Sequence, residues 1–180
     1  TVVAIDRKPK KTFSPGLYDL TELQRDANKI FGYSAKETLN IMQKLYESHK
    51  VLTYPRTDSR YISNDIVPTL PERLKACGVG EFRPLANKIL TKPIKANKSF
   101  VDDARVSDHH AIIPTEEYVN FSAFSDKERK IYDLVVKRFL AVLFPAHEYE
   151  QLTVQAEIGS EKFIARGKTV LTMGWKEVYA

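Results

Sequence analysis

The spacing of hydrophobic side chains predicts a helical middle part for this chain of 180 residues. Over residues 17–31, 34–49 and 125–144, hydrophobic side chains recur every three or four positions, as on the buried face of an amphipathic helix. Gly32 and Pro145 follow the first and the last of these stretches and are typical helix stops. The side chains that the first helix is predicted to bury are Leu20, Leu23, Ala27, Ile30 and Phe31.

Short polar patterns predict where the helices begin. Residues 21–24 and 34–37 each have the spacing of a capping box, in which two side chains satisfy free amide groups of the first turn. Residues 63–65 can cap a shorter helix, and a break is expected at Pro71 because a proline ring clashes inside a helix. Another short helix is predicted over residues 84–90.

Both ends of the chain have the pattern of β-strands. Residues 1–5 are apolar and β-branched, and the lysines and proline at 8–11 are predicted to end that strand in a loop. Apolar and polar residues alternate over 152–156, a Gly-Ser turn follows at 159–160, and a second apolar stretch returns at 163–165. Because the two ends flank the helical part, they could pair in one small sheet.

Composition narrows the class of protein. A hydrophobic content of 43% supports a core, and the net charge of +5 allows a polyanionic partner without requiring one. No run approaches the roughly 20 apolar residues of a membrane span, and residues 1–3 do not begin a signal peptide, so we expect a cytoplasmic protein. Cys77 is the only cysteine, which excludes an internal disulfide and a zinc site built from a cysteine cluster.

One short string combines a nucleophile with a permanent positive charge. Tyr54 and Arg56 flank Pro55, which fixes its own φ angle and favours an extended conformation for Tyr54. Residues two apart in an extended segment lie on the same side, so the two side chains can face one phosphate. A tyrosine hydroxyl can attack a phosphodiester, and a guanidinium stabilises the charge on the phosphate oxygens. By itself, the spacing also fits a tyrosine that only packs.

The whole string at 53–59, Thr-Tyr-Pro-Arg-Thr-Asp-Ser, resembles the active-site signature of type IA DNA topoisomerases. Its proline and the Ser-Arg-Tyr at 59–61 are most similar to the bacterial topoisomerase III branch. The resemblance implies that Tyr54 forms a 5′-phosphotyrosine with single-stranded DNA and that Arg56 contacts the attacked phosphate. Further DNA contacts are expected from Thr57, Asp58, Ser59 and Arg60. Turn formation is an equally good explanation for the first three of these.

A second string, at 106–115, contains two adjacent histidines. Neighbouring side chains diverge and no further ligand lies at a suitable spacing, so a structural histidine is a simpler interpretation than a metal site. Residues 109–115, however, resemble a His-x-Ala-Ile-x-Pro-Thr element of the family's active site. This implies a catalytic role for His109, whose imidazole could hydrogen-bond the phosphate or shuttle a proton. His110 falls on the first variable position of this element and is not included among the catalytic residues.

The resemblance covers nearly the whole chain and implies an α+β architecture. A mainly helical, tyrosine-bearing domain at 17–146 is expected to be inserted between β segments at 1–16 and 147–180, which belong to a hinge-like arch domain. The helical domain would lift away to open a gate for DNA. We expect a monomeric enzyme that cuts and rejoins single-stranded DNA, changing its topology or decatenating it, and that associates with the nucleoid.

The magnesium site of the family is expected outside this chain. Type IA enzymes bind Mg²⁺ through a spaced acidic cluster in an N-terminal domain, and no Asp-x-Asp-x-Glu run occurs here. The acidic pairs at 102–103 and 116–117 are interpreted as solvated. We therefore interpret the chain as an internal piece of a longer enzyme, without a metal site of its own, and expect it to be inactive alone.

Two other functions compete with this interpretation, and a nucleotide site is excluded. A non-catalytic module that binds single-stranded nucleic acid would use Tyr54 to stack on a base. A tyrosine recombinase needs several arginines and histidines upstream of its tyrosine, and here only Arg7, Arg25 and His49 precede it. The Gly-Lys-Thr at 167–169 lacks the earlier glycine and the strand-to-helix context of a phosphate-binding loop, which excludes a nucleotide site of that type.

Overall fold

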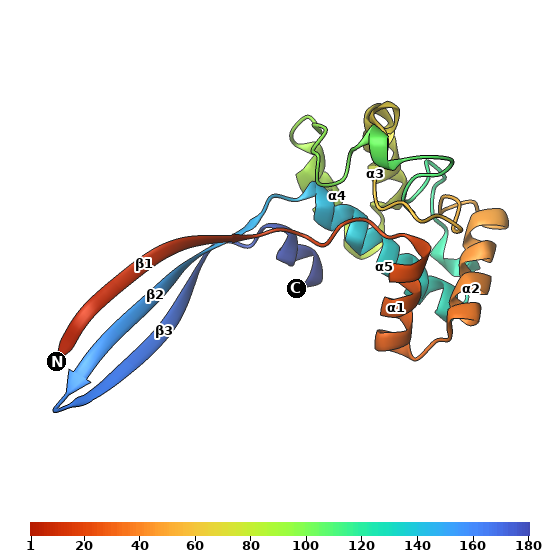
Figure 1. Cartoon of the computed structure of the whole chain (residues 1–180). Coiled ribbons are helices and arrows are strands. Elements are labelled where there is room, and N and C mark those ends of the chain that lie inside the picture. Colours follow the sequence, from red (N-terminus) through yellow and green to blue (C-terminus); the bar gives the residue numbers. More distant parts are fainter. The chain divides into compact units, whose positions relative to one another are not determined.

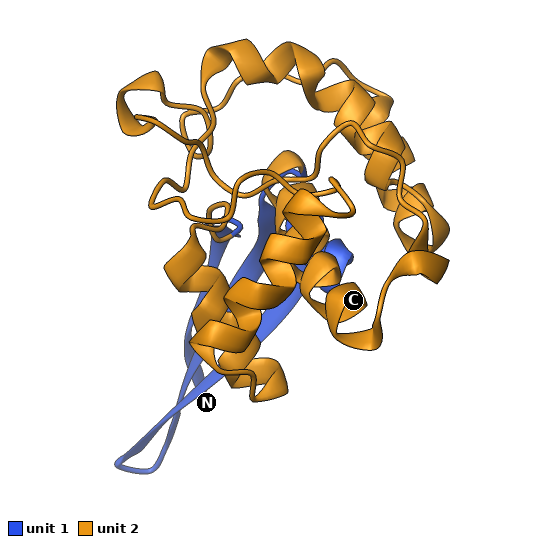
Figure 2. Cartoon of the chain, turned by 90° about the vertical axis from the view of Figure 1, so that its right-hand side faces the viewer, with its two compact units in different colours: residues 1–14, 144–180 blue, residues 15–143 orange.

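The computed structural model describes all residues 1–180 and divides them into two compact units (Figure 2). Unit 1 consists of residues 1–14 and 144–180, and unit 2 of residues 15–143. The chain is an α+β protein in which the helical unit 2 interrupts the β-rich unit 1 in sequence. The sequence prediction put the corresponding boundaries after residues 16 and 146. None of the helices is long and apolar enough to cross a membrane.

Five α-helices and several short 3₁₀ turns build unit 2. The helices are α1 (Leu20–Phe31), α2 (Ala35–Glu47), α3 (Leu70–Cys77), α4 (Arg83–Leu90) and α5 (Asp126–Leu143). The 3₁₀ turns are Asn64–Thr69, Gly80–Phe82, Asp103–Arg105 and Phe121–Ala123. Helix α5 packs against α1, α2 and α4, so it forms the centre of this unit (Figure 1).

The start of α1 differs from the sequence prediction. Asp19 caps this helix, because its carboxylate accepts a hydrogen bond from the Glu22 amide at 2.8 Å, whereas a capping box was predicted at 21–24. An aspartate one position before the helix satisfies the same free amides and takes precedence. Gly32, at φ 75°, ends the helix as predicted. Ile30 is 57% exposed, so its predicted burial was wrong.

Other local predictions are confirmed. The Ser34 hydroxyl accepts a hydrogen bond from the Glu37 amide at 3.1 Å and begins α2. The predicted break at Pro71 appears as a change from a 3₁₀ turn over Asn64–Thr69 to the α-helix that starts at Leu70. Pro71 lies in the first turn of α3, where its missing N–H has no helical partner to lose.

The core of unit 2 is formed by side chains from each helix. Its largest fully buried members include Leu23, Met42, Leu45, Leu74, Tyr132 and Phe139. Cys77 is also buried, and burial raises the pKa of its thiol to about 12. The thiol is therefore a packed side chain.

Unit 1 contains one antiparallel sheet with strand order β1-β2-β3, formed by β1 (Val2–Thr12), β2 (His147–Ile158) and β3 (Glu161–Thr172). The predicted pairing of the two chain ends is confirmed, because β1 pairs with β2. The predicted end of β1 at 8–11 was wrong, since the strand continues through Pro9, which lies opposite Glu150. A proline is tolerated there because β1 is an edge strand that needs hydrogen bonds on one side only.

The final residues of unit 1 form a 3₁₀ turn over Gly174–Tyr179. The Trp175 indole N–H donates to the Thr12 carbonyl at 3.0 Å, which joins this turn to the end of β1. Gly174 has φ 57°, and a Cβ atom there would lie 2.2 Å from the Ala146 carbonyl oxygen, so only glycine fits.

Candidate active site

Two extended segments of unit 2 place the tyrosine. Residues 51–53 pair in antiparallel fashion with residues 113–115. The Thr53 amide donates to the Ile113 carbonyl at 3.0 Å, and the Ile113 amide donates to the Thr53 hydroxyl at 3.0 Å. This pairing brings the two strings of the sequence analysis together, because Tyr54 follows one segment and His109 precedes the other.

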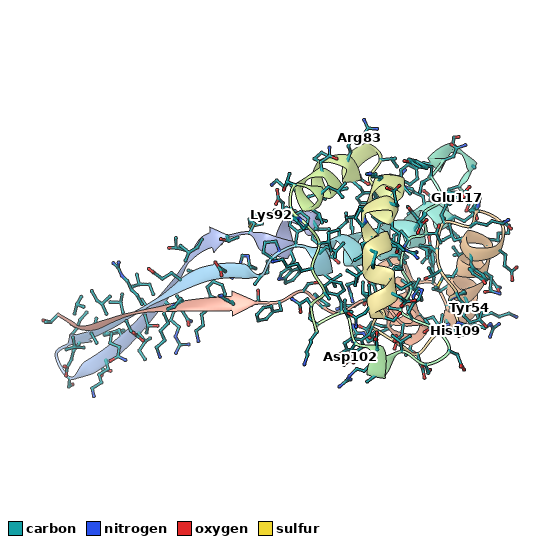
Figure 3. The ribbon with its side chains drawn as sticks, turned by 90° about the horizontal axis from the view of Figure 1, so that it is seen from above. Tyr54, Arg83, Lys92, Asp102, His109 and Glu117 are labelled. Carbon is teal, nitrogen blue, oxygen red and sulfur yellow. The ribbon has the colours of Figure 1, made fainter.

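Tyr54 and His109 lie face to face (Figure 3). Their ring centroids are 4.1 Å apart and the rings are inclined by 28°, which is a stacked arrangement. On another side, Tyr46 of α2 approaches Tyr54 edge-on, with centroids 5.5 Å apart. Tyr54 is half-buried and His109 is exposed. The phenol is thus held by two rings while its surroundings stay open to solvent.

Arg56 lies in the same region as His109. The two side chains line one hollow of about 460 Å³, together with Leu20, Thr21, Thr57, Asp58, Ser107 and Asp108. The Arg56 guanidinium is exposed and makes no hydrogen bond or ion pair within the chain. It is therefore available to a bound anion, although Asp58 and Asp108 reduce the net positive charge of the hollow.

The side chains at 57–60 differ in burial and in the hydrogen bonds that they make within the chain. Thr57 and Ser59 are buried, and the Ser59 hydroxyl donates to the Arg105 carbonyl at 2.8 Å. The Arg60 guanidinium donates to the Leu17 carbonyl at 3.0 Å. These three side chains brace the loop, whereas Asp58 is exposed and unpaired. Their DNA contacts remain predictions.

The adjacent histidines have different environments. His110 is half-buried, and its Nδ1 atom donates to the Ala111 carbonyl at 2.7 Å. Burial is the main reason why the pKa of His110 lies below the ordinary histidine value. No group of three or more His, Cys, Asp or Glu side chains in this chain is arranged to hold a metal ion.

Sequence reasoning missed three residues around the tyrosine. Thr53 was seen only as part of the string, but its hydroxyl bonds both Ile113 and the Ala111 carbonyl. Tyr46 falls in the hydrophobic repeat over residues 34–49, which predicts the buried face of a helix, and its half-exposed ring instead contacts Tyr54. No pattern in the sequence identified Lys50, yet this residue lines a second hollow with Tyr54.

Comparisons with known proteins identify the family of this chain. The model of the DNA topoisomerase family matches residues 1–180. A DNA topoisomerase 3 from Bacillus cereus is 85% identical over 179 residues, covering 99% of this chain and 25% of the relative. A DNA topoisomerase 3 from Bacillus subtilis is 61% identical over 178 residues, covering 99% and 24%. The chain thus spans about a quarter of the length of the curated relatives it matches.

A solved structure shows the same fold. Full-length topoisomerase I from Thermotoga maritima superposes with a TM-score of 0.71 at 24% identity, covering 99% of this chain and 29% of that protein. Because the family model matches the whole chain and a DNA topoisomerase 3 is 85% identical to it, this chain belongs to the type IA DNA topoisomerase family and is similar to its topoisomerase III branch.

Proposed function

We propose that this chain carries the nucleophile of a longer type IA topoisomerase. The Tyr54 phenolic oxygen attacks a phosphodiester of single-stranded DNA and forms a new oxygen–phosphorus bond. The bond from phosphorus to the 3′ oxygen breaks, the phenol proton leaves to water or a base, and the 3′ oxygen takes up a proton. The product is a 5′-phosphotyrosine with a free 3′-hydroxyl. The reverse reaction rejoins the strand after another strand has passed.

Arg56 and His109 act on the attacked phosphate. A guanidinium without an internal partner can form two hydrogen bonds to phosphate oxygens as their charge increases. The His109 ring is stacked on the phenol, and no hydrogen bond joins the imidazole to the Tyr54 hydroxyl. From there the imidazole can donate a hydrogen bond to the phosphate or to the leaving 3′ oxygen.

One observation carries this proposal: a half-exposed tyrosine stacks on an exposed histidine next to a hollow that contains an unpaired arginine. A tyrosine that only stabilised the core would be closed off from solvent by its neighbours. The family membership supports the same reaction, because relatives named DNA topoisomerase 3 match the chain over 99% of its length.

The longer enzyme would supply what this chain lacks. Two carboxylates line the hollow around Arg56, so a phosphate there needs further positive charge. In our proposal Mg²⁺ is held by acidic residues outside this chain and supplies that charge. Unit 2 is the tyrosine-bearing domain and unit 1 belongs to the hinge-like arch. We propose a monomer that acts at the nucleoid, and a chain of 180 residues that cannot relax supercoiled DNA alone.

The test is covalent trapping in the longer enzyme with a labelled single-stranded oligonucleotide. Tyr54→Phe should abolish the adduct and leave oligonucleotide binding within about twofold, since only the nucleophilic oxygen is lost. Tyr118→Phe removes the same oxygen from a tyrosine that is 68% exposed, and should leave the adduct unchanged. If Tyr54→Phe still forms a wild-type adduct, this tyrosine is not the nucleophile, and a role in binding alone takes its place.

A further inference from the structure

Lys50 has an unusual backbone conformation close to the tyrosine. Its φ angle of 57° makes it the only non-glycine residue of this chain with a positive φ. The Val51 amide donates to the Leu45 carbonyl at 3.0 Å, which closes the end of α2 around Lys50. Glycine is the usual residue at this position of such a closing turn, because it has no Cβ atom to clash. A lysine here suggests that the side chain has a function.

The surrounding structure holds Lys50 in this conformation. The Thr115 hydroxyl donates to the Lys50 carbonyl at 2.6 Å, and the Thr115 amide donates to the Val51 carbonyl at 3.0 Å. Both bonds come from the segment that also pairs with Thr53. The position of Lys50 is therefore fixed by the same pairing that places Tyr54.

Lys50 and Tyr54 line one hollow of about 600 Å³, a volume typical of sites for small organic molecules. Its other lining residues are Tyr46, Glu47, Leu52, Thr53 and Thr115. Two aromatic rings and a leucine provide apolar walls, and Lys50 provides the positive charge. The Glu47 carboxylate, which accepts a hydrogen bond from the Gln43 amide at 3.2 Å, also lines this hollow and offsets part of the Lys50 charge.

The two hollows adjoin the stacked rings and differ in composition. Tyr54 belongs to the hollow of Lys50, and His109 belongs to the hollow of Arg56. The hollow of Arg56 is mainly polar, and the hollow of Lys50 is rich in aromatic surface. A DNA strand with one phosphate at Tyr54 carries its next base and phosphate within reach of such a neighbouring site.

We propose that the hollow lined by Tyr46 and Lys50 is a nucleotide subsite. It binds the nucleotide next to the phosphodiester that Tyr54 attacks, with the base against the Tyr46 ring and the phosphate on the Lys50 ammonium group. This inference rests on the proposed function, because it names the substrate group that lies beside the nucleophile. The occupant is DNA, since an aromatic wall and a single cation match one base and one phosphate.

Binding of a fluorescent oligodeoxynucleotide to the longer enzyme, followed as a function of salt, tests the contact to Lys50. Each phosphate contact to a single strand contributes about 0.7 to the slope of log affinity against log salt, so Lys50→Gln should reduce the slope by that amount. Lys50→Arg should retain it. Lys92→Gln removes one exposed lysine charge at the opposite side of unit 2 and should leave the slope unchanged (Figure 3). Equal slopes for wild type and Lys50→Gln, or no binding by the wild type, would overturn the subsite.

The stacking contact has its own test. Tyr46→Leu should weaken binding about tenfold at every salt concentration without changing the slope, and Tyr46→Phe should keep wild-type affinity. An oligonucleotide that contains 5-iodouracil should form a photocrosslink that mass spectrometry maps to Tyr46. Crosslinks that lie only elsewhere would contradict the assignment.

These readouts do not require strand cleavage, so the two proposals can fail separately. If Tyr54→Phe abolishes the adduct while Lys50→Gln leaves the salt slope unchanged, the subsite alone is wrong. If the Lys50 and Tyr46 variants behave as expected while Tyr54→Phe still forms the adduct, the proposed nucleophile is wrong and the binding site remains.

Discussion

Thr53 and Ile113, 60 positions apart in sequence, are joined by two hydrogen bonds. The amide of each residue is a donor, and the acceptors are the Ile113 carbonyl and the Thr53 hydroxyl. The Thr53 hydroxyl also donates to the Ala111 carbonyl at 3.3 Å. Because Tyr54 is the next residue after Thr53, this pair determines how close the phenol comes to His109.

Thr53→Val should therefore impair both stability and reaction. Valine has the same shape, but it leaves the Ile113 amide without its acceptor, which should lower the free energy of unfolding by ~1–3 kcal/mol. A small displacement of Tyr54 should slow adduct formation in the longer enzyme by about tenfold or more. Urea unfolding and single-turnover trapping measure the two effects. Thr53→Ser keeps the hydroxyl and should retain most of the rate, and an equal loss for serine and valine would argue against the hydrogen bond as the cause.

Substitutions of Arg56 and Arg60 should have opposite effects: the first should impair the reaction, and the second should lower the free energy of unfolding. Arg56 has no partner in the chain, so Arg56→Ala should change the free energy of unfolding by less than ~0.5 kcal/mol. Adduct formation should fall by about 100-fold or more, because charge stabilisation at the phosphate is lost. Arg60→Ala removes hydrogen bonds to the Leu17 and Gly16 carbonyls and should cost ~1–3 kcal/mol of stability. The interpretation fails if Arg56→Ala is the less stable variant and Arg60→Ala the less active one.

Lys50→Gly should make the chain more stable while it loses the proposed phosphate contact. Glycine adopts the left-handed conformation without strain, and the expected gain in free energy of unfolding is ~0.5–1 kcal/mol. Lys44→Gly is a matched control inside α2, where glycine should instead cost ~1 kcal/mol. Thermal unfolding of the three proteins gives the comparison. A loss of stability in Lys50→Gly would mean that the lysine side chain contributes packing that outweighs the strain.

The start of α5 should become less stable in acid because of Glu128. Burial acts to raise the pKa of this carboxyl, but hydrogen bonds from the Ser125 amide and from His49 outweigh it, so the pKa lies below the ordinary value. A lowered folded-state pKa contributes stability that is complete above the unfolded value of about 4.3 and is lost as the pH falls through the folded value.

Glu128→Gln tests this linkage. The variant should be less stable than the wild type at neutral pH by ~1 kcal/mol, and the difference should shrink as the pH falls below about 4. Urea unfolding at a series of pH values measures it. Glu117→Gln neutralises an exposed carboxylate and should follow the wild type at every pH. A difference between Glu128→Gln and the wild type that is independent of pH would contradict the role of the charge.

The sequence predicted features that depend on neighbouring residues. The helical periods, the N-cap at Ser34 and the stop at Gly32 were confirmed, because caps and stops act within one turn. Where two local signals competed, as at Asp19 and the 21–24 pattern, sequence reasoning chose the wrong one. Pro9 was interpreted as a strand end because its tolerance depends on its place at the sheet edge, which only the pairing with β2 reveals.

The sequence by itself selected the candidate side chains, since Tyr54, Arg56 and His109 all come from two short strings, and their catalytic roles stay predictions. Only the tertiary structure decided how they are arranged. The stack of Tyr54 on His109 and the hollow that Arg56 shares with His109 arise from contacts between segments far apart in the chain. Such contacts are set by hydrogen bonds and packing between distant segments, and no local pattern of residues encodes them.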